Sequence, residues 1–175
     1  MDRLDYLVAL NDADILSQLA AFDPHVAGTP PLGLDLPTSD IDILCFAPDP
    51  ELFVRAVWKA FEALPEFHIG QKIGHDRPVV ARFAHGGWTI ELFGQAIPVS
   101  KQYGWRHLLV ERRLLALGSA AFRNAVMARR RAGLKTEPAF AAVLGLAGDP
   151  YQALLELETC ADEDLLARLS IKGLA

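Results

Sequence analysis

The stretch at residues 40–46 constrains the fold most, because two aspartates there lead into an unbroken apolar run that ends before Pro48. Such a run is typical of a strand that is buried on both faces in its second half. Asp49 is then suited to cap a helix, Pro50 to occupy its first position, and one apolar helical face continues to Leu64. A strand that leads into a capped helix predicts α/β structure.

Weaker patterns on either side extend this prediction. Residues 2–22 carry apolar side chains at helical spacing and predict one or two opening helices, and glycine and proline punctuate a loop at residues 28–38. A hairpin turn is expected at residues 84–87. Three short β-prone runs predict further strands, at residues 67–73, 79–83 and 88–93. We therefore expect an α/β or α+β fold in which helices flank a mixed β-sheet.

The C-terminal half is expected to be helical. Gly118 predicts the end of a first helix that buries Tyr103, His107, Val110 and Leu114 and exposes its arginines. Further helix starts are indicated at Ser119, at Thr136, at Asp149 before Pro150, and at the acidic cluster 162–164. The sequence thus predicts an α/β core at residues 1–99 and a helical region at residues 100–175 that packs on it.

Composition narrows the class of protein. The chain has 175 residues, a formal net charge of -5 and no long basic run, which argues against a protein that coats nucleic acid. We expect Arg129–Arg131 to form a solvated helix end. No apolar run is long enough to span a membrane, and the charged N-terminus does not resemble a signal peptide, so a soluble, cytoplasmic protein is expected.

Cysteines and histidines give no sign of a zinc site. Cys45 and Cys160 are the two cysteines, and neither lies in a zinc-binding spacing, so both are expected to be reduced structural thiols. The histidines likewise lack a ligand spacing and are expected at the surface or in turns; they are His25, His68, His75, His85 and His107.

An aspartate pair separated by one residue occurs three times, but only the middle pair is expected on a strand. The pairs at residues 12–14 and 162–164 fall in helical patterns, where such acids cap or solvate helix ends. On a strand, residues two apart share a face, so Asp40 and Asp42 would project together while Ile41 packs behind them. Two aligned carboxylates repel each other unless a cation such as Mg²⁺ compensates. The alternative is an exposed strand end with solvated acids.

Two further features favour a cation site. Gly28 allows the backbone to approach a phosphate closely, and backbone N–H groups with the Thr29 hydroxyl can donate to phosphate oxygens. Glu91 lies between apolar residues in a β-prone run and would therefore point away from them. If its strand lies beside the first, three carboxylates converge.

In order and spacing, Gly28-Thr29, Asp40-Ile41-Asp42-Ile43 and Ile90-Glu91-Leu92 resemble the nucleotidyltransferase superfamily with the polymerase-β-like fold. Residues 28–43 also resemble DUF4269, a family of bacterial proteins within that superfamily. The chain departs from the superfamily at the hook, where Thr29 replaces the usual serine but keeps the hydroxyl.

The resemblance implies that Asp40, Asp42 and Glu91 bind Mg²⁺ or Mn²⁺ and that Gly28, Thr29 and Ser39 cradle the phosphates. A nucleoside monophosphate, with AMP as the expected group, would pass from its triphosphate to a hydroxyl acceptor that the sequence does not identify. The alternatives are a catalytically silent or antitoxin-like member that binds a partner protein or a second copy, and a Mn²⁺-dependent glycosyltransferase, which explains neither the hook nor Glu91.

Overall fold

The computed structural model describes residues 3–73 and 77–175 and therefore leaves out His75, so the expectation for that histidine lies outside the described residues. The chain forms two compact units, residues 1–105 and residues 106–175, and the division falls within a helix. Within the described residues, no helix is both long and apolar enough to cross a membrane.

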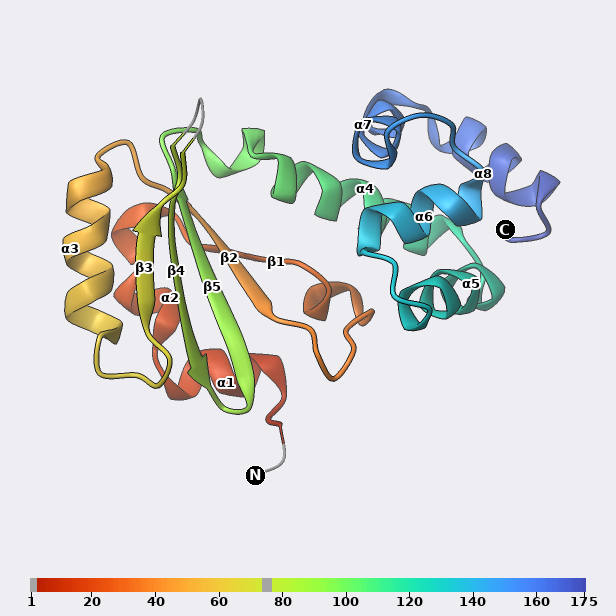
Figure 1. The fold of residues 1–175 in the computed structure, drawn as a ribbon. Helices are drawn as coiled ribbons and strands as arrows, with labels where there is room; N and C mark the ends of the chain where they lie inside the picture. Colours follow the sequence, from red (N-terminus) through yellow and green to blue (C-terminus); the bar gives the residue numbers. More distant parts are fainter. Residues whose placement is uncertain (1–2, 74–76) are drawn as a thin grey trace. The chain divides into compact units, whose positions relative to one another are not determined.

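A five-stranded mixed sheet forms the centre of the first unit, in the order β1-β2-β5-β4-β3 (Figure 1). β2 and β5 run parallel, whereas the other neighbouring pairs run antiparallel, which confirms the expected mixed sheet with flanking helices. The strands are β1 (His25–Ala27), β2 (Ile41–Phe46), β3 (His68–Gln71), β4 (Val79–His85) and β5 (Trp88–Gln95).

The predicted step from strand to helix is confirmed. β2 is followed by α3 (Pro50–Phe61), and the Asp49 side chain accepts hydrogen bonds from the backbone N–H groups of Glu51 and Leu52, both at 3.0 Å. These bonds satisfy N–H groups that have no partner inside the helix. The cap therefore fixes where the chain leaves the sheet, close to the end of the strand that carries Asp42.

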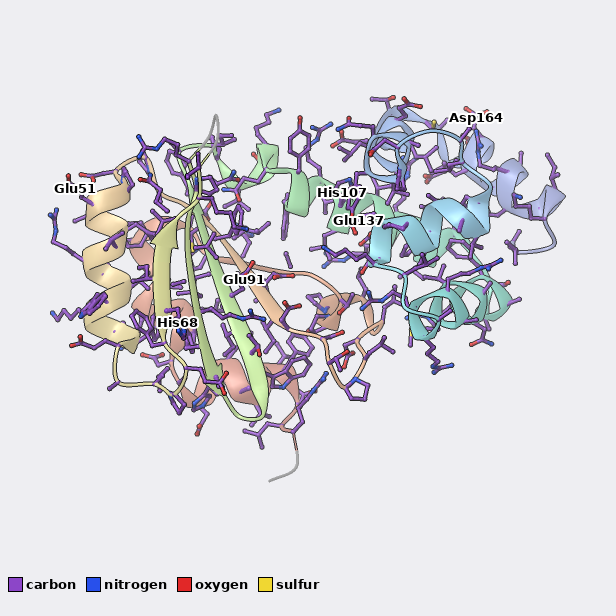
Figure 2. All side chains as sticks on the ribbon, in the orientation of Figure 1. Glu51, His68, Glu91, His107, Glu137 and Asp164 are labelled. Carbon is purple, nitrogen blue, oxygen red and sulfur yellow. The ribbon has the colours of Figure 1, made fainter. Side chains whose placement is uncertain are left out.

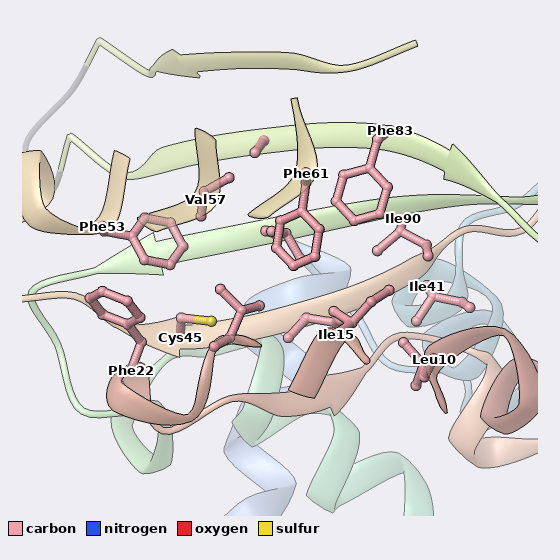
Figure 3. Packing of buried hydrophobic residues seen from close by; sticks show 14 of the residues in the cluster. Leu10, Ile15, Phe22, Ile41, Cys45, Phe53, Val57, Phe61, Phe83 and Ile90 are labelled. Atoms are coloured by element: carbon pink, nitrogen blue, oxygen red, sulfur yellow. The ribbon is translucent and has the colours of Figure 1, made fainter. Parts of the chain in front are cut away.

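One face of the sheet is covered by three helices, α1 (Tyr6–Asp12), α2 (Ile15–Gln18) and α3, and by the short 3-10 turn η1 (Ala20–Phe22). Figure 3 shows their apolar side chains packed against those of β2, β4 and β5. Gly94 on β5 has no side chain because Phe53 of α3 occupies the space, and a Cβ there would lie 2.5 Å from a ring carbon. Ile41, Ile43, Ile90 and Leu92 are fully buried in this core.

The turn between β4 and β5 lies within the hairpin turn expected at residues 84–87, although the strands extend further and leave only two residues in the turn. His85 pairs with Trp88, and the residues between them, Gly86 and Gly87, have φ angles of 58° and 80°. Two consecutive positive φ angles match the twist of antiparallel strands and favour glycine. The hairpin sets the register of β5 and therefore the position of Glu91.

Helices make up the second unit, as expected. Its elements are the larger part of α4 (Tyr103–Leu117), α5 (Ala120–Arg131), α6 (Thr136–Leu144), α7 (Pro150–Leu155), η4 (Glu156–Thr159) and α8 (Asp162–Ile171), whereas the short turns η2 (Pro30–Leu32) and η3 (Val99–Lys101) belong to the first unit. Helices begin at or next to each predicted start. Asp149 caps α7 by accepting hydrogen bonds from Tyr151 and Gln152.

One expectation for α4 is wrong. Tyr103 was expected to pack inward, but it is 60% exposed, because it lies in the first turn of the helix. Arg112 is exposed, as expected, and the Arg106 and Arg113 side chains are about 30% exposed while Arg106 donates to Glu158 at 2.6 Å and Arg113 donates to Asp162 at 2.6 Å. Arg106 and Arg113 join α4 to η4 and α8 inside the helical unit.

Candidate functional site

The two aspartates of the middle pair lie at the start of β2. Asp42 is the second residue of the strand and Asp40 immediately precedes it. Ile41 and Ile43 are fully buried in the core, so Asp42 projects from the opposite face of the sheet, which we call the open face. Both aspartates are partly exposed. Their carboxylates are therefore accessible to a ligand while the backbone that carries them is held by the core.

Glu91 lies directly beside Asp42. The two residues are register partners on the parallel strands β5 and β2, and the Ile90 and Leu92 side chains that flank Glu91 are fully buried. Register partners project from the same face, and neighbouring strands lie about 4.8 Å apart. Side chains 49 positions apart in sequence are thus brought together on the open face, where Figure 2 labels Glu91.

Gly28 packs against Asp42 from the other side. Ala27, the last residue of β1, is the register partner of Asp42, and Gly28 follows with a φ angle of +75°. A Cβ added to Gly28 would overlap the carboxylate of Asp42. Only glycine therefore allows the backbone to approach this carboxylate so closely, which gives the predicted hook a physical requirement.

Thr29 and Ser39 lie at the two ends of the loop that joins β1 to β2. Thr29 is only 7% exposed, and its carbonyl accepts hydrogen bonds from the N–H groups of Leu32 and Leu34. The Ser39 hydroxyl accepts from the N–H of Leu36 at 2.9 Å. Both residues shape the loop that delivers the chain to Asp40, and Gly28 is the more accessible part of the hook.

Arg3 is a residue that sequence reasoning missed. It donates to the carbonyl of Leu36 at 2.6 Å and pairs with Asp35 at 2.5 Å, while its guanidinium lies 3.3 Å from the centre of the Trp88 ring. It thereby ties the loop before Asp40 to the first residue of β5. No local pattern reveals such a contact, because its partners are more than 30 positions away.

The donor chemistry of the site fits a divalent ion, since carboxylate oxygens are the ligands that Mg²⁺ prefers. In residues 3–73 and 77–175, however, no three His, Cys, Asp or Glu side chains are already grouped closely enough to hold a metal. Binding of an ion would therefore require the carboxylates of Asp40, Asp42 and Glu91 to turn toward one another by rotation of their side chains.

The other candidate residues have structural contacts. Asp12 contacts His85 at 2.8 Å and Asp162 contacts Arg113, consistent with acids at helix ends. His25 contacts Asp23, and His68 and His107 contact backbone carbonyls. Cys45 and Cys160 are both free thiols, as expected. Burial, reinforced by the nearby Asp23 carboxylate, raises the pKa of Cys45 to about 12, so this thiol is unreactive at neutral pH.

A protein-family model described as a domain of unknown function, DUF4269, matches residues 8–157. The chain belongs to the DUF4269 family. The match covers the sheet, the three carboxylates and most of the helical unit. A search of curated proteins found no match.

Solved structures show which fold this DUF4269 chain shares. It matches a structure of the GLD-2/RNP-8 complex with a TM-score of 0.50 and 13% identity, over 87% of this chain and 58% of the other. It matches Cid1, described as an RNA terminal uridylyl transferase, with a TM-score of 0.53 and 11% identity, over 83% and 44%. A Cid1 poly(U) polymerase structure described as MgGTP bound gives 0.53 and 12%, over 82% and 46%.

These likenesses establish a nucleotidyltransferase-like fold. The DUF4269 chain spans about half the length of the solved chains it matches. At such low identity the likeness concerns the fold alone, so the activity and substrates of those proteins do not transfer to this chain without further argument.

Proposed function

We propose that this DUF4269 protein is a metal-dependent nucleotidyltransferase that moves a nucleoside monophosphate, with AMP as the expected group, from a triphosphate to an acceptor hydroxyl. The observation that carries the proposal is the register of Asp42 opposite Glu91 on parallel strands, with Gly28 against Asp42. The shared fold supports it, because one of the similar structures is described as binding MgGTP.

In the proposed reaction the acceptor oxygen forms a bond to the α-phosphorus, while the bond from that phosphorus to the oxygen bridging to the β-phosphate breaks. Pyrophosphate leaves with the bonding electron pair. Bound Mg²⁺ or Mn²⁺ would neutralise the charge that develops on the phosphates. Asp40, Asp42 and Glu91 would hold the metal, and Glu91 would also accept the proton of the attacking hydroxyl.

The hook would hold the triphosphate on the β1 side of Asp42. The positive φ angle of Gly28 and its lack of a side chain allow a phosphate to approach the backbone N–H groups closely. Thr29 and Ser39 would complete the cradle. Because the core fixes the strand and the Asp49 cap fixes its exit, the site would need little reorganisation of the backbone.

One observation favours a second function, that of a catalytically silent or antitoxin-like binding protein. The three carboxylates are not gathered into a metal centre in the described part of the chain. A silent member would keep the fold and bind a protein partner without turning over a triphosphate. Turnover therefore separates the two functions.

The test is a screen of α-³²P-labelled triphosphates with the purified full chain, Mg²⁺ and cell extract. We expect a labelled acceptor product and release of pyrophosphate with the wild-type chain, and neither with Glu91→Gln. Glu163→Gln is the matched control, because it makes the same change at an exposed residue of α8. Equal labelling by wild type and Glu91→Gln would refute the assignment, and absence of turnover with every triphosphate would favour the silent protein.

A further inference from the structure

The row of side chains that contains Asp42 and Glu91 continues across the open face. Glu91 is the register partner of Arg82 on β4, and Arg82 is the register partner of His68 on β3. Both Arg82 and His68 are exposed, and Figure 2 labels His68 on its strand. The row therefore changes from acidic to basic along its length, with two carboxylates on β2 and β5 and basic side chains on β4 and β3.

A second cation lies over the same strands. The Lys72 ammonium lies 4.8 Å from the centre of the Phe93 ring. Phe93 follows Glu91 by two positions on β5 and so projects from the open face as well. Lys72 and Arg82 thus bring positive charge to the β4 side of Glu91, and the partly exposed Phe93 ring contacts the Lys72 ammonium.

The simplest explanation for Arg82 is a cross-strand ion pair with Glu91, since opposite charges in register stabilise a sheet. The structure does not show this pair, although the two residues are register partners. Within residues 3–73 and 77–175, neither Arg82 nor Lys72 forms an ion pair with a carboxylate. As far as residues 3–73 and 77–175 are concerned, both cations are therefore available to an external anion.

We propose that Arg82 and Lys72 form an anion site that binds a phosphate group of the acceptor substrate. The inference rests on the proposed function, which places the triphosphate at Gly28, on the opposite side of the carboxylates. The planar guanidinium of Arg82 matches a phosphate with two parallel hydrogen bonds, and Lys72 adds a compact positive charge. The Phe93 ring offers a surface on which a base or sugar can stack.

The order of groups along the row gives each substrate its place. Gly28 and Asp42 take the triphosphate, Glu91 lies next to the point of attack, and Arg82 lies one strand beyond Glu91, about 5 Å away between Cα atoms. A hydroxyl near a bound phosphate would therefore reach Glu91. The acceptor class is a hydroxyl compound that carries phosphate, either a nucleic-acid strand or a phosphorylated small molecule.

The test measures binding of the full chain to two probes in EDTA, a fluorescein-labelled single-stranded RNA hexamer and ribose 5-phosphate. Arg82→Gln should weaken binding of at least one probe about tenfold and leave Mg-ATP binding, measured separately without EDTA, unchanged. Asp42→Asn should weaken Mg-ATP binding and leave binding of the probes unchanged. Arg55→Gln is the matched control, because it removes the same charge from an exposed position on α3, which covers the other face.

The two probes distinguish the sources of the phosphate. Binding of either probe supports the site if Arg82→Gln weakens that binding about tenfold and Arg82→Lys partly restores it. Equal binding by wild type, Arg82→Gln and Arg55→Gln, or no binding of either probe at millimolar concentration, would overturn it. If the wild type binds a probe in an Arg82-dependent way but does not bind Mg-ATP, the result would count against the triphosphate site alone.

Discussion

Carboxylates differ in solvent exposure between the sheet unit and the helical unit. Asp42 and Glu91 are partly exposed on the open face, on strands whose other face is packed. Glu111 on α4 is 4% exposed, and one of its carboxylate oxygens is buried without a hydrogen-bond partner in the described residues. Burial raises the pKa of Glu111 well above its usual value, and the nearby Glu137 carboxylate raises it further, against a smaller opposing effect of Arg130.

The difference teaches how burial decides what a carboxylate can do. A charged group without compensation is expensive in a low-dielectric interior, so burial favours the protonated, neutral form of Glu111. On the open face, the carboxylates of Asp42 and Glu91 are partly exposed, so water reaches them. Asp42 and Glu91 in the sheet unit are therefore accessible to a ligand. Glu111 in the helical unit is not, and its burial makes the stability of the protein depend on pH.

The largest expected effect follows removal of one charge from the open face. Asp42→Asn should lower nucleotidyl transfer on the order of 10³-fold, because a ligand of the proposed metal is lost, while the free energy of unfolding changes little. Steady-state kinetics and chemical denaturation measure the two quantities. Asp14→Asn is the control, since Asp14 is exposed, belongs to another aspartate pair and has a φ angle of 49°, which asparagine tolerates. Equal losses in both variants would remove the distinction between the pairs.

A substitution at the hook should have an intermediate effect. Gly28→Ala should weaken Mg-ATP binding by about tenfold or more, because its Cβ would displace the Asp42 carboxylate. Gly133→Ala isolates this contact, since Gly133 also has a positive φ angle but nothing within 4 Å of an added Cβ. Both variants should lose about 1 kcal/mol of stability from backbone strain. If calorimetry shows equal Mg-ATP affinity in the two variants, the hook has no role in binding.

The smallest effect is expected in the helical unit and concerns stability alone. Above pH 4.5 the unfolded chain releases the Glu111 proton while the folded chain keeps it, so Glu111 lowers the free energy of unfolding progressively as pH rises toward its raised folded pKa. Glu111→Gln should therefore gain stability relative to wild type as pH rises above 4.5, with Mg-ATP binding unchanged.

Denaturation curves at several pH values measure this gain, and Glu163→Gln, which changes an exposed glutamate, should show no such trend. A constant difference between Glu111→Gln and wild type at every pH would show that Glu111 is ionised in the folded protein.

The sequence predicts those parts of the molecule that local patterns specify. The alternation of Ile41, Asp42 and Ile43 assigns the faces of β2 correctly, and Asp49 with Pro50 marks the start of α3, because both depend on neighbours in sequence. That Glu91 lies on the strand beside Asp42 requires the strand order, which the family resemblance supplied and composition did not.

What the sequence missed depends on contacts between distant residues. The link from Arg3 to the loop before Asp40, the burial of Glu111 and the ion pairs of Arg106 all join segments far apart in sequence. The proposed role of Arg82 was likewise not predicted, because it depends on the register of Arg82 with Glu91. Helical spacing alone placed Tyr103 inside, since periodicity carries no information on where packing against a helix begins.

The most direct test asks whether Asp42 and Glu91 bind the same cation. It is a double-mutant cycle in which calorimetry measures binding of a non-hydrolysable ATP analogue with Mg²⁺ to wild type, Asp42→Asn, Glu91→Gln and the double variant. If the two side chains share an ion, either substitution already removes most of the binding energy, and the double variant should fall short of the sum by at least about 1 kcal/mol. Additive losses, or unchanged affinity in the Glu91→Gln variant, would contradict a common metal site.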